Sequence, residues 1–314
     1  MGGIKVSVIV EAFPDVPGVS TSARDTLASL DRQDYPLNRV EIIVPQHGWS
    51  AELRRTVKQQ YPRARILDAP EAGYNRLKNL GVQHARGEII AFADSDTTVC
   101  PRWVSSLVET IDAGADVSIG LMKFSGDSLL DRLCTYFMFG QMLRRSAGRI
   151  RSFNIANVAF KASLIKANPL DERLTRQGGS IEIGRRLFRA GAALALSPDQ
   201  VSEHEFYGIN RHTWQFAIFE THDFLEVREK HPAMSLSGLT RRLPLALPPV
   251  AAAALFGADL VNLIQNRRLI RMRLFESPVF VLASLAMRTF EIPAMYWALI
   301  DRKGVRAFLE RRVI

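Results

Sequence analysis

The most constraining feature of the sequence is an apolar segment that ends in two aspartates. Residues 89–93 read Ile-Ile-Ala-Phe-Ala, and Asp94-Ser95-Asp96 follow at once. An apolar run of this length, directly after Arg86-Gly87-Glu88, predicts a buried β-strand. Open α/β sheets bind ligands at the carboxyl ends of their strands, and two carboxylates there suit a hard divalent cation that bridges phosphate oxygens. The alternative is that both aspartates only cap the following turn.

Strand-like and helix-like patterns alternate around this segment, which is typical of an α/β fold. The first strand should be central in the sheet, and the short segment 64–67 should lie at an edge. Further strands are predicted at 4–10, 40–44, 64–67, 115–121, 153–161 and 192–198, and helices at 20–31, 52–60, 101–113, 129–145 and after 171.

Net charge narrows the classes of binding partner, and cysteine content indicates the redox conditions that the protein tolerates. The formal net charge is +9 and the pI is near 9.9, which predicts attraction to anions such as nucleotide diphosphates, nucleic acid or an anionic membrane. No nucleic-acid-binding motif is present, so no nucleic-acid partner is expected. Two cysteines are too few for a disulfide scaffold and are compatible with a reducing cytosol. The early apolar run Val6–Val10 is short and is not expected to be a signal peptide.

Residues 78–96 resemble the inverting family 2 glycosyltransferases, which have the GT-A fold. The resemblance covers roughly residues 4–220. It implies a Rossmann-like mixed sheet and transfer of a sugar from a nucleotide-diphosphate donor to a hydroxyl acceptor, either lipid-linked or a growing glycan, with Mn²⁺ or Mg²⁺. The residues that match the family spacing are Lys78, Asn79, Gly81, Ala85, Gly87, Glu88, Phe92, Asp94 and Asp96.

The resemblance also implies a donor site. Asp96 and His204 would ligate the metal, although a structural histidine is an alternative for His204. A surface lysine is likewise an alternative for Lys78. The nucleotide-sugar-binding residues would be Phe13, Gln46, Lys78, Asp94 and Ser95.

One donor-site motif departs from the family. Gln46-His47-Gly48 stands where the family has Asp-Asp-Gly-Ser, whose aspartate holds the nucleotide base. Gln46 still offers a donor and an acceptor, so the resemblance implies base binding with an altered preference.

The acceptor side departs further from the family pattern. Asn157 lies in a stretch that resembles the strand lining the acceptor pocket, and Trp214 in a segment that resembles the family's basic-aromatic segment without its usual Q-x-x-R-W order. Gly179-Ser180 stand where the family has a Glu-Asp pair that supplies the general base. An inverting displacement needs a carboxylate to take the proton of the acceptor hydroxyl. Glu182 is the nearest replacement, although a glutamate in a first helical turn is also favoured by the helix dipole. A catalytically degenerate, scaffolding relative is therefore the alternative function.

A compositional shift near residue 230 predicts a GT-A domain at 1–230 and a helical, membrane-associating region at 231–314. The segments 243–264 and 274–300 are apolar and long enough to span a bilayer. Arginines flank both, which conflicts with a two-span hairpin under the positive-inside rule. We therefore expect helices that lie on an anionic membrane, at its cytoplasmic face. Two true spans, or helices packed on the domain or in an oligomer, remain alternatives.

Overall fold

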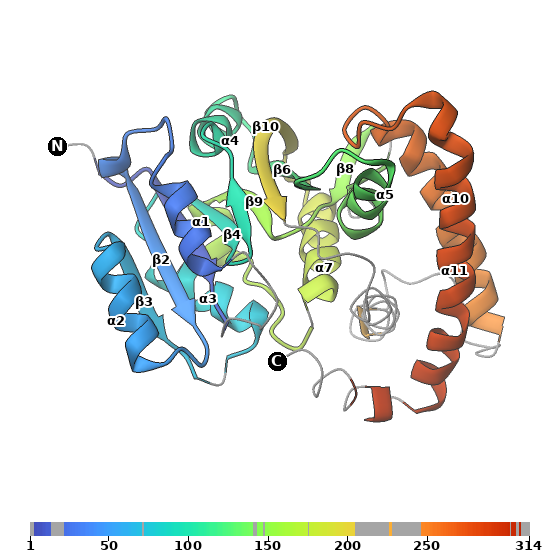
Figure 1. The fold of residues 1–314 in the computed structure, drawn as a ribbon, viewed down its shortest axis with the longest axis horizontal. Coiled ribbons are helices and arrows are strands. Elements are labelled where there is room, and N and C mark those ends of the chain that lie inside the picture. The colour runs from blue at the N-terminus through green and yellow to red at the C-terminus, as the bar shows by residue number, and fades with distance from the viewer. Residues whose placement is uncertain are drawn as a thin grey trace. The chain divides into compact units, whose positions relative to one another are not determined.

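The computed structural model divides into two compact units (Figure 1). The first unit is Met1–Thr135 with Met142–Phe206, and the second is Tyr136–Gln141 with Tyr207–Ile314. The expected boundary at residue 230 lies outside the described residues. The structure describes residues 3–13, 22–70, 72–140, 143–146, 148–174, 176–204, 226–227, 246–301, 303–305 and 308.

A mixed sheet organises the first unit, in the strand order β3-β2-β1-β4-β9-β6-β10-β5. The first four of these strands are parallel, β9 is antiparallel to both its neighbours, and β5 is antiparallel to β10. This confirms the expected α/β, GT-A-like fold, with β1 inside the sheet and β3 at its edge. The strands are β1 Val6–Glu11, β2 Val40–Gln46, β3 Ala64–Asp68, β4 Ile89–Asp94, β5 Thr97–Val99, β6 Val117–Phe124, β9 Asn157–Lys161 and β10 Leu194–His204.

Helices connect and cover these strands. Helix α3 packs on β1 and β2, and α4 packs on β6 and β10. Local capping defines some of the boundaries: α2 begins after Ser50, whose side-chain oxygen accepts a hydrogen bond from the Leu53 N–H. The helices of this unit are α1 Ala23–Leu30, α2 Ala51–Gln60, α3 Tyr74–His84, α4 Trp103–Asp112, α5 Leu129–Met138, α6 Ala162–Ala167 and α7 Arg176–Arg189.

The core lies along the parallel strands. All residues of β1, β2 and β4 are buried, as expected for parallel strands that are covered on both faces. The register pairs Val6 with Ile89 and ends with Glu11 opposite Asp94. The carboxyl ends of two neighbouring strands therefore place acidic side chains at the same level of the sheet.

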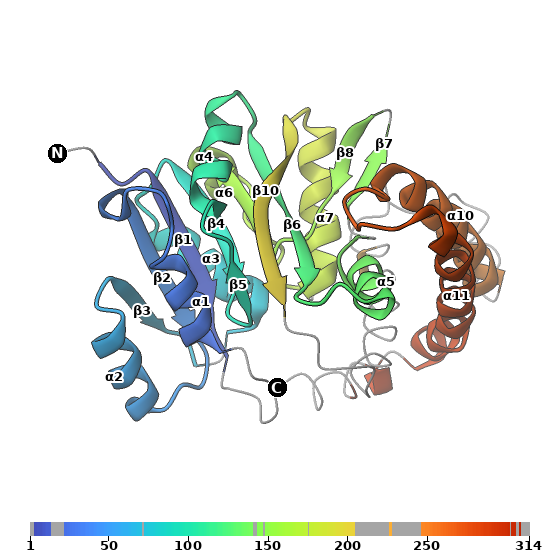
Figure 2. The ribbon, with the colours of Figure 1, turned by 45° about the horizontal axis from the view of Figure 1, so that its top comes forward.

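Three predicted elements differ from the structure in their bounds, and the strand expected at 153–161 begins only at Asn157. The helix expected at 129–145 ends at Met138, and a hairpin follows that consists of β7 Arg144–Ser146 and β8 Arg149–Ser152 (Figure 2). Gly148 supplies the positive φ of 76° that its turn requires. The last strand continues past Pro198 to His204, because a register shift between Leu196 and Val201 lets it resume pairing with β6.

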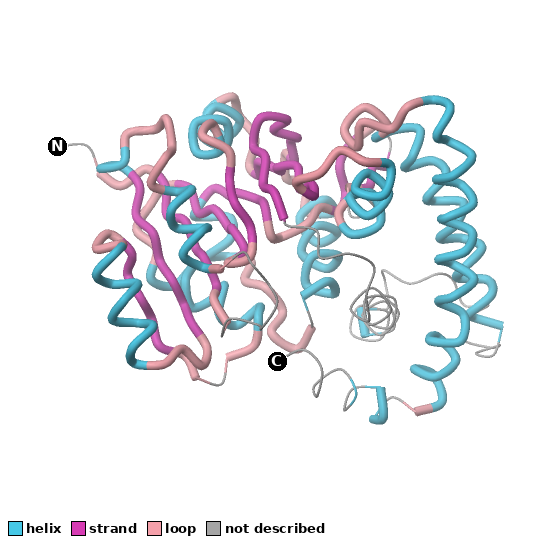
Figure 3. The backbone as a smooth tube through the Cα atoms, in the orientation of Figure 1, coloured by secondary structure: helices cyan, strands magenta, loops and turns pink. Residues whose placement is uncertain are grey.

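The second unit contains two long helices, α10 Leu247–Asn266 and α11 Ser277–Ile300, joined through a short 3₁₀ turn at Leu274–Glu276 (Figure 3). Charged side chains meet in its interior. The Arg288 guanidinium donates to Asp259 at 2.7 and 3.0 Å and to Glu291 at 2.5 Å, and all three residues are buried. The Tyr136 hydroxyl donates to the backbone carbonyl of Asp259 at 3.0 Å.

The outer surface of the same helices is apolar. Of the exposed large apolar side chains in the described part of the chain, all except Leu129 and Leu130 belong to α10, α11 or the turn between them. This unit thus combines a buried charged cluster and a small apolar core with an outer surface that is unusually rich in apolar side chains. Its exposed apolar side chains are Val250, Val261, Ile264, Leu274, Phe275, Val279, Leu282, Leu285, Phe290 and Ile300.

Candidate functional site

A buried lysine joins the carboxyl ends of β1 and β4. Lys78 Nζ donates to Glu11 Oε2 at 2.5 Å and to Asp94 Oδ1 at 3.0 Å, and the three side chains are at most 4% exposed. The Tyr74 hydroxyl also donates to Asp94 Oδ1, at 2.8 Å. The ammonium group lies 4.7 Å from the centre of the Tyr74 ring and 4.9 Å from that of Phe92. Lys78 is therefore an interior counter-ion and not a surface lysine.

This cluster includes two residues that the sequence analysis did not assign to the site, Glu11 and Tyr74. Glu11 could have been found from the sequence, because a glutamate at the end of an apolar strand is a buried charge that needs an oppositely charged partner. Ser95, between the two aspartates, is half-buried in the turn that connects β4 to β5.

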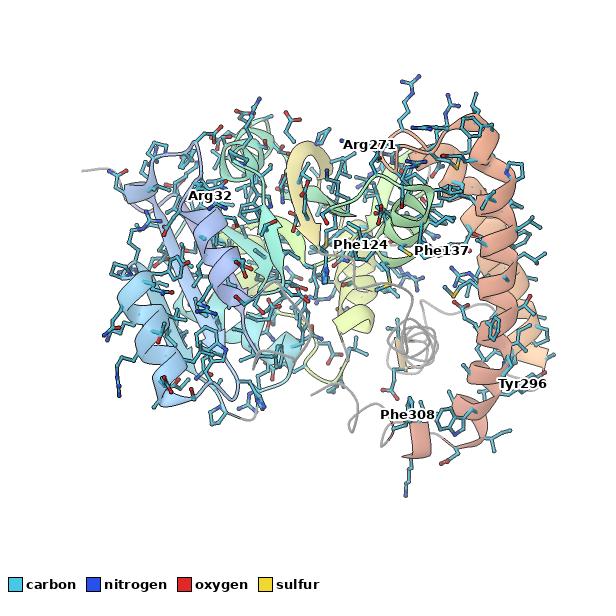
Figure 4. The ribbon with its side chains drawn as sticks, in the orientation of Figure 1. Arg32, Phe124, Phe137, Arg271, Tyr296 and Phe308 are labelled. Atoms are coloured by element: carbon cyan, nitrogen blue, oxygen red, sulfur yellow. The ribbon has the colours of Figure 1, made fainter. Side chains whose placement is uncertain are left out.

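Asp96 and His204 meet at the same edge. His204 Nε2 lies 3.1 Å from Asp96 Oδ2, with the side chains 19% and 31% exposed. Antiparallel pairing of β10 with β5 brings them together, because it places His204 opposite Thr97. Phe124, labelled in Figure 4, lies at the end of β6, and its ring is 5.7 Å from the imidazole. A partly exposed carboxylate and imidazole are ligand types that Mn²⁺ accepts.

These two side chains are too few to enclose a cation by themselves. Within the residues that the structure describes, no group of three or more His, Cys, Asp or Glu side chains is placed to hold a metal ion. The arrangement fits a cation whose remaining positions are taken by a ligand's oxygens or by water.

Gln46 occupies the end of β2, and each polar atom of its side-chain amide makes one hydrogen bond. Its Oε1 accepts from the Trp49 backbone N–H at 2.8 Å, and its Nε2 donates to Asp68 Oδ1 at the end of β3. Asp68 also pairs with Arg54 at 2.8 Å. The hydrogen bonds from Arg54 and Gln46 lower the pKa of Asp68. A carboxylate thus lies beside Gln46, supplied by the neighbouring strand, and the sequence analysis missed it.

Aromatic rings lie next to this polar group. The Phe13 and His47 rings are 5.9 Å apart, and the Trp49 indole N–H donates to the Phe13 carbonyl at 3.0 Å. Rings beside amide and carboxylate groups can stack on a planar base and hydrogen-bond to its edge.

Asn157 belongs to a buried network that joins β9, β6 and β10. Its Oδ1 accepts from Trp103 Nε1 at 2.8 Å and from Gln200 Nε2 at 3.0 Å. Its Nδ2 donates to the carbonyls of Leu121 and Gln200. The side chain is thus held inside the sheet by four hydrogen bonds. Trp214, the other predicted acceptor-side residue, lies outside the described residues.

Glu182 lies in α7 and is 1% exposed. Arg186 donates to both of its carboxylate oxygens, at 2.8 and 3.0 Å. Ser180, two residues earlier, accepts a hydrogen bond from the Ile155 N–H at 3.3 Å. Glu182 is therefore a buried carboxylate whose oxygens are both engaged by an arginine of the same helix.

Known proteins share this architecture. The solved structure of the mannosyltransferase PcManGT from Pyrobaculum calidifontis, in complex with GDP-Man and Mn²⁺, superposes with a TM-score of 0.63 at 15% identity, over 95% of this chain and 87% of that one. GalNAc-T7 with UDP, GalNAc and Mn²⁺ gives a TM-score of 0.53 at 15% identity, over 72% and 48% of the chains. At these identities the likeness shows the GT-A fold.

Sequence relatives and a family model extend the comparison. The chain is 24% identical over 209 residues to the glycosyltransferase AglE of Haloferax volcanii, covering 63% of this chain and 66% of that protein. It is 29% identical over 126 residues to the putative glycosyltransferase EpsH of Bacillus subtilis, covering 39% and 34%. It thus spans less than two thirds of either relative. The model described as glycosyl transferase family 2 matches residues 7–174, more than half of the sequence, and the chain belongs to this family.

Proposed function

We propose that this protein transfers a sugar from a nucleotide-diphosphate donor to a hydroxyl acceptor. The observation that carries the proposal is the 3.1 Å approach of His204 to Asp96, next to the buried cluster of Lys78, Glu11 and Asp94. This combination lies at the carboxyl edge of the sheet, where α/β folds bind ligands. Two proteins of the same fold, PcManGT and GalNAc-T7, were solved with a nucleotide or nucleotide sugar and Mn²⁺.

The nucleotide base would bind at the ends of β1, β2 and β3. Phe13 and His47 offer ring surfaces for stacking, and the Gln46–Asp68 pair offers a donor and acceptors for the base edge. Arg54 keeps Asp68 anionic. In this proposal Asp68 takes the role of the carboxylate that Gln46 replaces on β2.

Asp96 and His204 would hold Mn²⁺ or Mg²⁺, which would neutralise charge on the leaving diphosphate. Asp94 and Ser95 would contact the donor. Lys78 and Tyr74 hold the Asp94 carboxylate in position through their hydrogen bonds. Preorganised contacts of this kind stabilise a transition state because little has to move during the reaction.

Glu182 is the proposed general base for the acceptor hydroxyl. Its oxygens are engaged by Arg186, so this role requires Arg186 to release the carboxylate when the acceptor binds. Asn157 would act by fixing the sheet behind the acceptor side, and Trp214 stays a prediction. Glu182→Gln should abolish transfer while donor binding persists.

The second unit would attach the enzyme to an anionic membrane at its cytoplasmic face, where a lipid-linked acceptor or a growing glycan is available. Helices α10 and α11 are long and apolar enough to cross a bilayer, judged by length and composition. Their exposed apolar side chains would enter the lipid. The flanking arginines would contact anionic headgroups.

The donor site can be tested by calorimetry. The full chain is titrated with UDP, GDP and their sugar conjugates, with and without Mn²⁺. Asp96→Asn should remove the metal-dependent part of binding. Asp34→Asn, the same change at an exposed position, should leave it intact. Metal-independent binding, or unchanged binding by Asp96→Asn, would contradict the metal assignment. No binding of any donor by the wild type would favour a non-catalytic scaffold.

A further inference from the structure

Polar side chains on and just after helix α1 hold the segment that carries Asp96. Thr26 and Ser29 lie one turn apart on α1, and Gln33 follows the end of this helix. All three are buried, and each hydrogen-bonds to the backbone of residues 97–104. Figure 2 shows α1 beside β5, against which it packs.

Thr26 connects the two ends of the turn that contains Asp96. Ser95 and Asp96 form a two-residue turn between β4 and β5, so Asp94 and Thr97 are its ends. The Thr26 hydroxyl donates to the Thr97 carbonyl at 2.6 Å and lies 3.4 Å from the Asp94 carbonyl. The Thr97 hydroxyl donates to the Asp94 carbonyl at 2.9 Å. Two buried hydroxyl groups therefore fix the backbone of this turn.

Ser29 and Gln33 hold the strand that follows the turn. The Val99 N–H donates to Ser29 Oγ at 3.1 Å, and Gln33 Nε2 donates to the Cys100 carbonyl at 2.9 Å. Gln33 Oε1 accepts from the Val104 N–H at 2.9 Å, which is one of the N–H groups at the start of α4 that lack a partner within the helix. Strand β5 needs this support, because it has three residues and ends the strand order of the sheet.

The position of Asp96 relative to His204 depends on this turn and strand. Their contact at 3.1 Å requires β5 to keep its register with β10, which pairs Thr97 with His204. A metal ion tolerates only small changes in the positions of its ligands. Removal of a group that holds a ligand in place typically weakens metal binding by about 10–100-fold.

We propose that Thr26 is a positioning residue for the metal site. Its hydroxyl fixes the turn so that Asp96 faces His204 at a distance that a divalent cation can bridge. Thr26 acts through the Thr97 carbonyl and touches neither the metal nor the substrate. This inference rests on the metal site of the proposed glycosyl transfer, and it assigns control of metal affinity to a side chain that is not a ligand.

Manganese binding measures this control without a known acceptor. The full chain in detergent is titrated with Mn²⁺, and the electron paramagnetic resonance signal of free Mn²⁺ gives the bound fraction. Thr26→Val keeps the branched shape, removes the hydroxyl and should weaken Mn²⁺ binding by about tenfold. Thr26→Ser keeps the hydroxyl and should retain most of the affinity, whereas Asp96→Asn should abolish binding. Wild-type affinity in Thr26→Val, an equal loss in Thr26→Ser, or no Mn²⁺ binding by the wild type overturns the proposal.

Ser7→Ala separates positioning from a general loss of stability. Ser7 is as buried as Thr26, and its hydroxyl donates to Glu41 at 2.6 Å at the amino end of β1, away from the turn. This variant should melt at a lower temperature and keep the wild-type Mn²⁺ affinity; a loss of affinity equal to that of Thr26→Val overturns the proposal. Thr97→Val removes the second hydroxyl of the turn and should also weaken Mn²⁺ binding, so it carries the test if Thr26→Val does not fold.

Addition of UDP or GDP separates this inference from the proposed function. A wild-type protein that binds Mn²⁺ but neither nucleotide contradicts the proposed donor site, while the comparison of Thr26→Val with Thr26→Ser still tests the positioning role. Nucleotide binding in EDTA without any binding of Mn²⁺ supports the donor site and overturns the role of Thr26.

Discussion

Replacement of Lys78 by methionine should lower the free energy of unfolding by about 3–5 kcal/mol at pH 7. Methionine keeps an unbranched apolar stem of similar length, with a sulfur in place of one methylene, and lacks the ammonium group. That group lies 2.5 Å from Glu11 and 3.0 Å from Asp94, inside a cluster that is at most 4% exposed. Its loss leaves two buried carboxylates facing each other without the shared cation, which is the costly way to break a buried ion pair.

Urea denaturation followed by tryptophan fluorescence measures this loss, because Trp49 and Trp103 are both buried in the first unit. Typical domain stabilities of about 5–15 kcal/mol leave room for the measurement. Glu11→Gln/Lys78→Met removes one of the two opposed charges and should recover part of the stability that Lys78→Met loses. If Lys78→Met does not fold, the double variant can still be compared with the wild type. Lys58→Met, at an exposed position on α2, should change stability by less than about 0.5 kcal/mol.

The pH dependence provides the decisive check. In Lys78→Met either carboxylate can take up a proton as the pH falls, so the deficit relative to wild type should shrink between pH 7 and pH 5. A cost below about 1 kcal/mol that is identical at both pH values would refute the assignment of Lys78 as the counter-ion of two ionised carboxylates.

Two further predictions concern the sheet and the second unit. Gly120→Ala should destabilise the protein by about 1–3 kcal/mol, because its Cβ would overlap Asn157 Oδ1 and the Gln200 carbonyl. Gly3→Ala, where a Cβ meets nothing within 4 Å, is the control, and similar melting temperatures of the two variants would contradict the clash. Leu282→Asp, at a side chain that is 65% exposed, should reduce flotation of the full chain with anionic liposomes and leave its melting temperature unchanged; undiminished flotation would contradict lipid contact.

Local patterns in the sequence identified the parallel half of the sheet. The run at 89–93 and the aspartates after it are contiguous in sequence, so the strand and its acidic end were predictable. The hairpin at 144–152 was not, because the apolar spacing of 129–145 continues past Met138, where the helix ends. The short strand β5 was not predictable either, because its pairing with β10 joins residues about a hundred positions apart in the sequence.

In the candidate site, too, some features were predictable from the sequence and others depend on contacts between distant segments. Asp96 and His204 were placed together by resemblance, and the structure gives the reason in the β5–β10 register. The partnership of Lys78 with Glu11 depends on the side-by-side arrangement of α3, β1 and β4, which no local pattern encodes. Asp68 was missed for the same reason, since its contact with Gln46 runs between neighbouring strands.

The apolar outer surface of the second unit separates the packing of its helices from the chemistry of its surface. Inward positions such as Asp259 and Arg288 hold the helices to each other, whereas outward positions such as Leu282, which is 65% exposed, contribute less to that packing. Substitutions on the outer surface are therefore expected to change how the protein interacts with lipid or detergent at only a small cost in folding. Detergent, and not a higher concentration of salt, is the additive expected to keep the isolated protein dispersed.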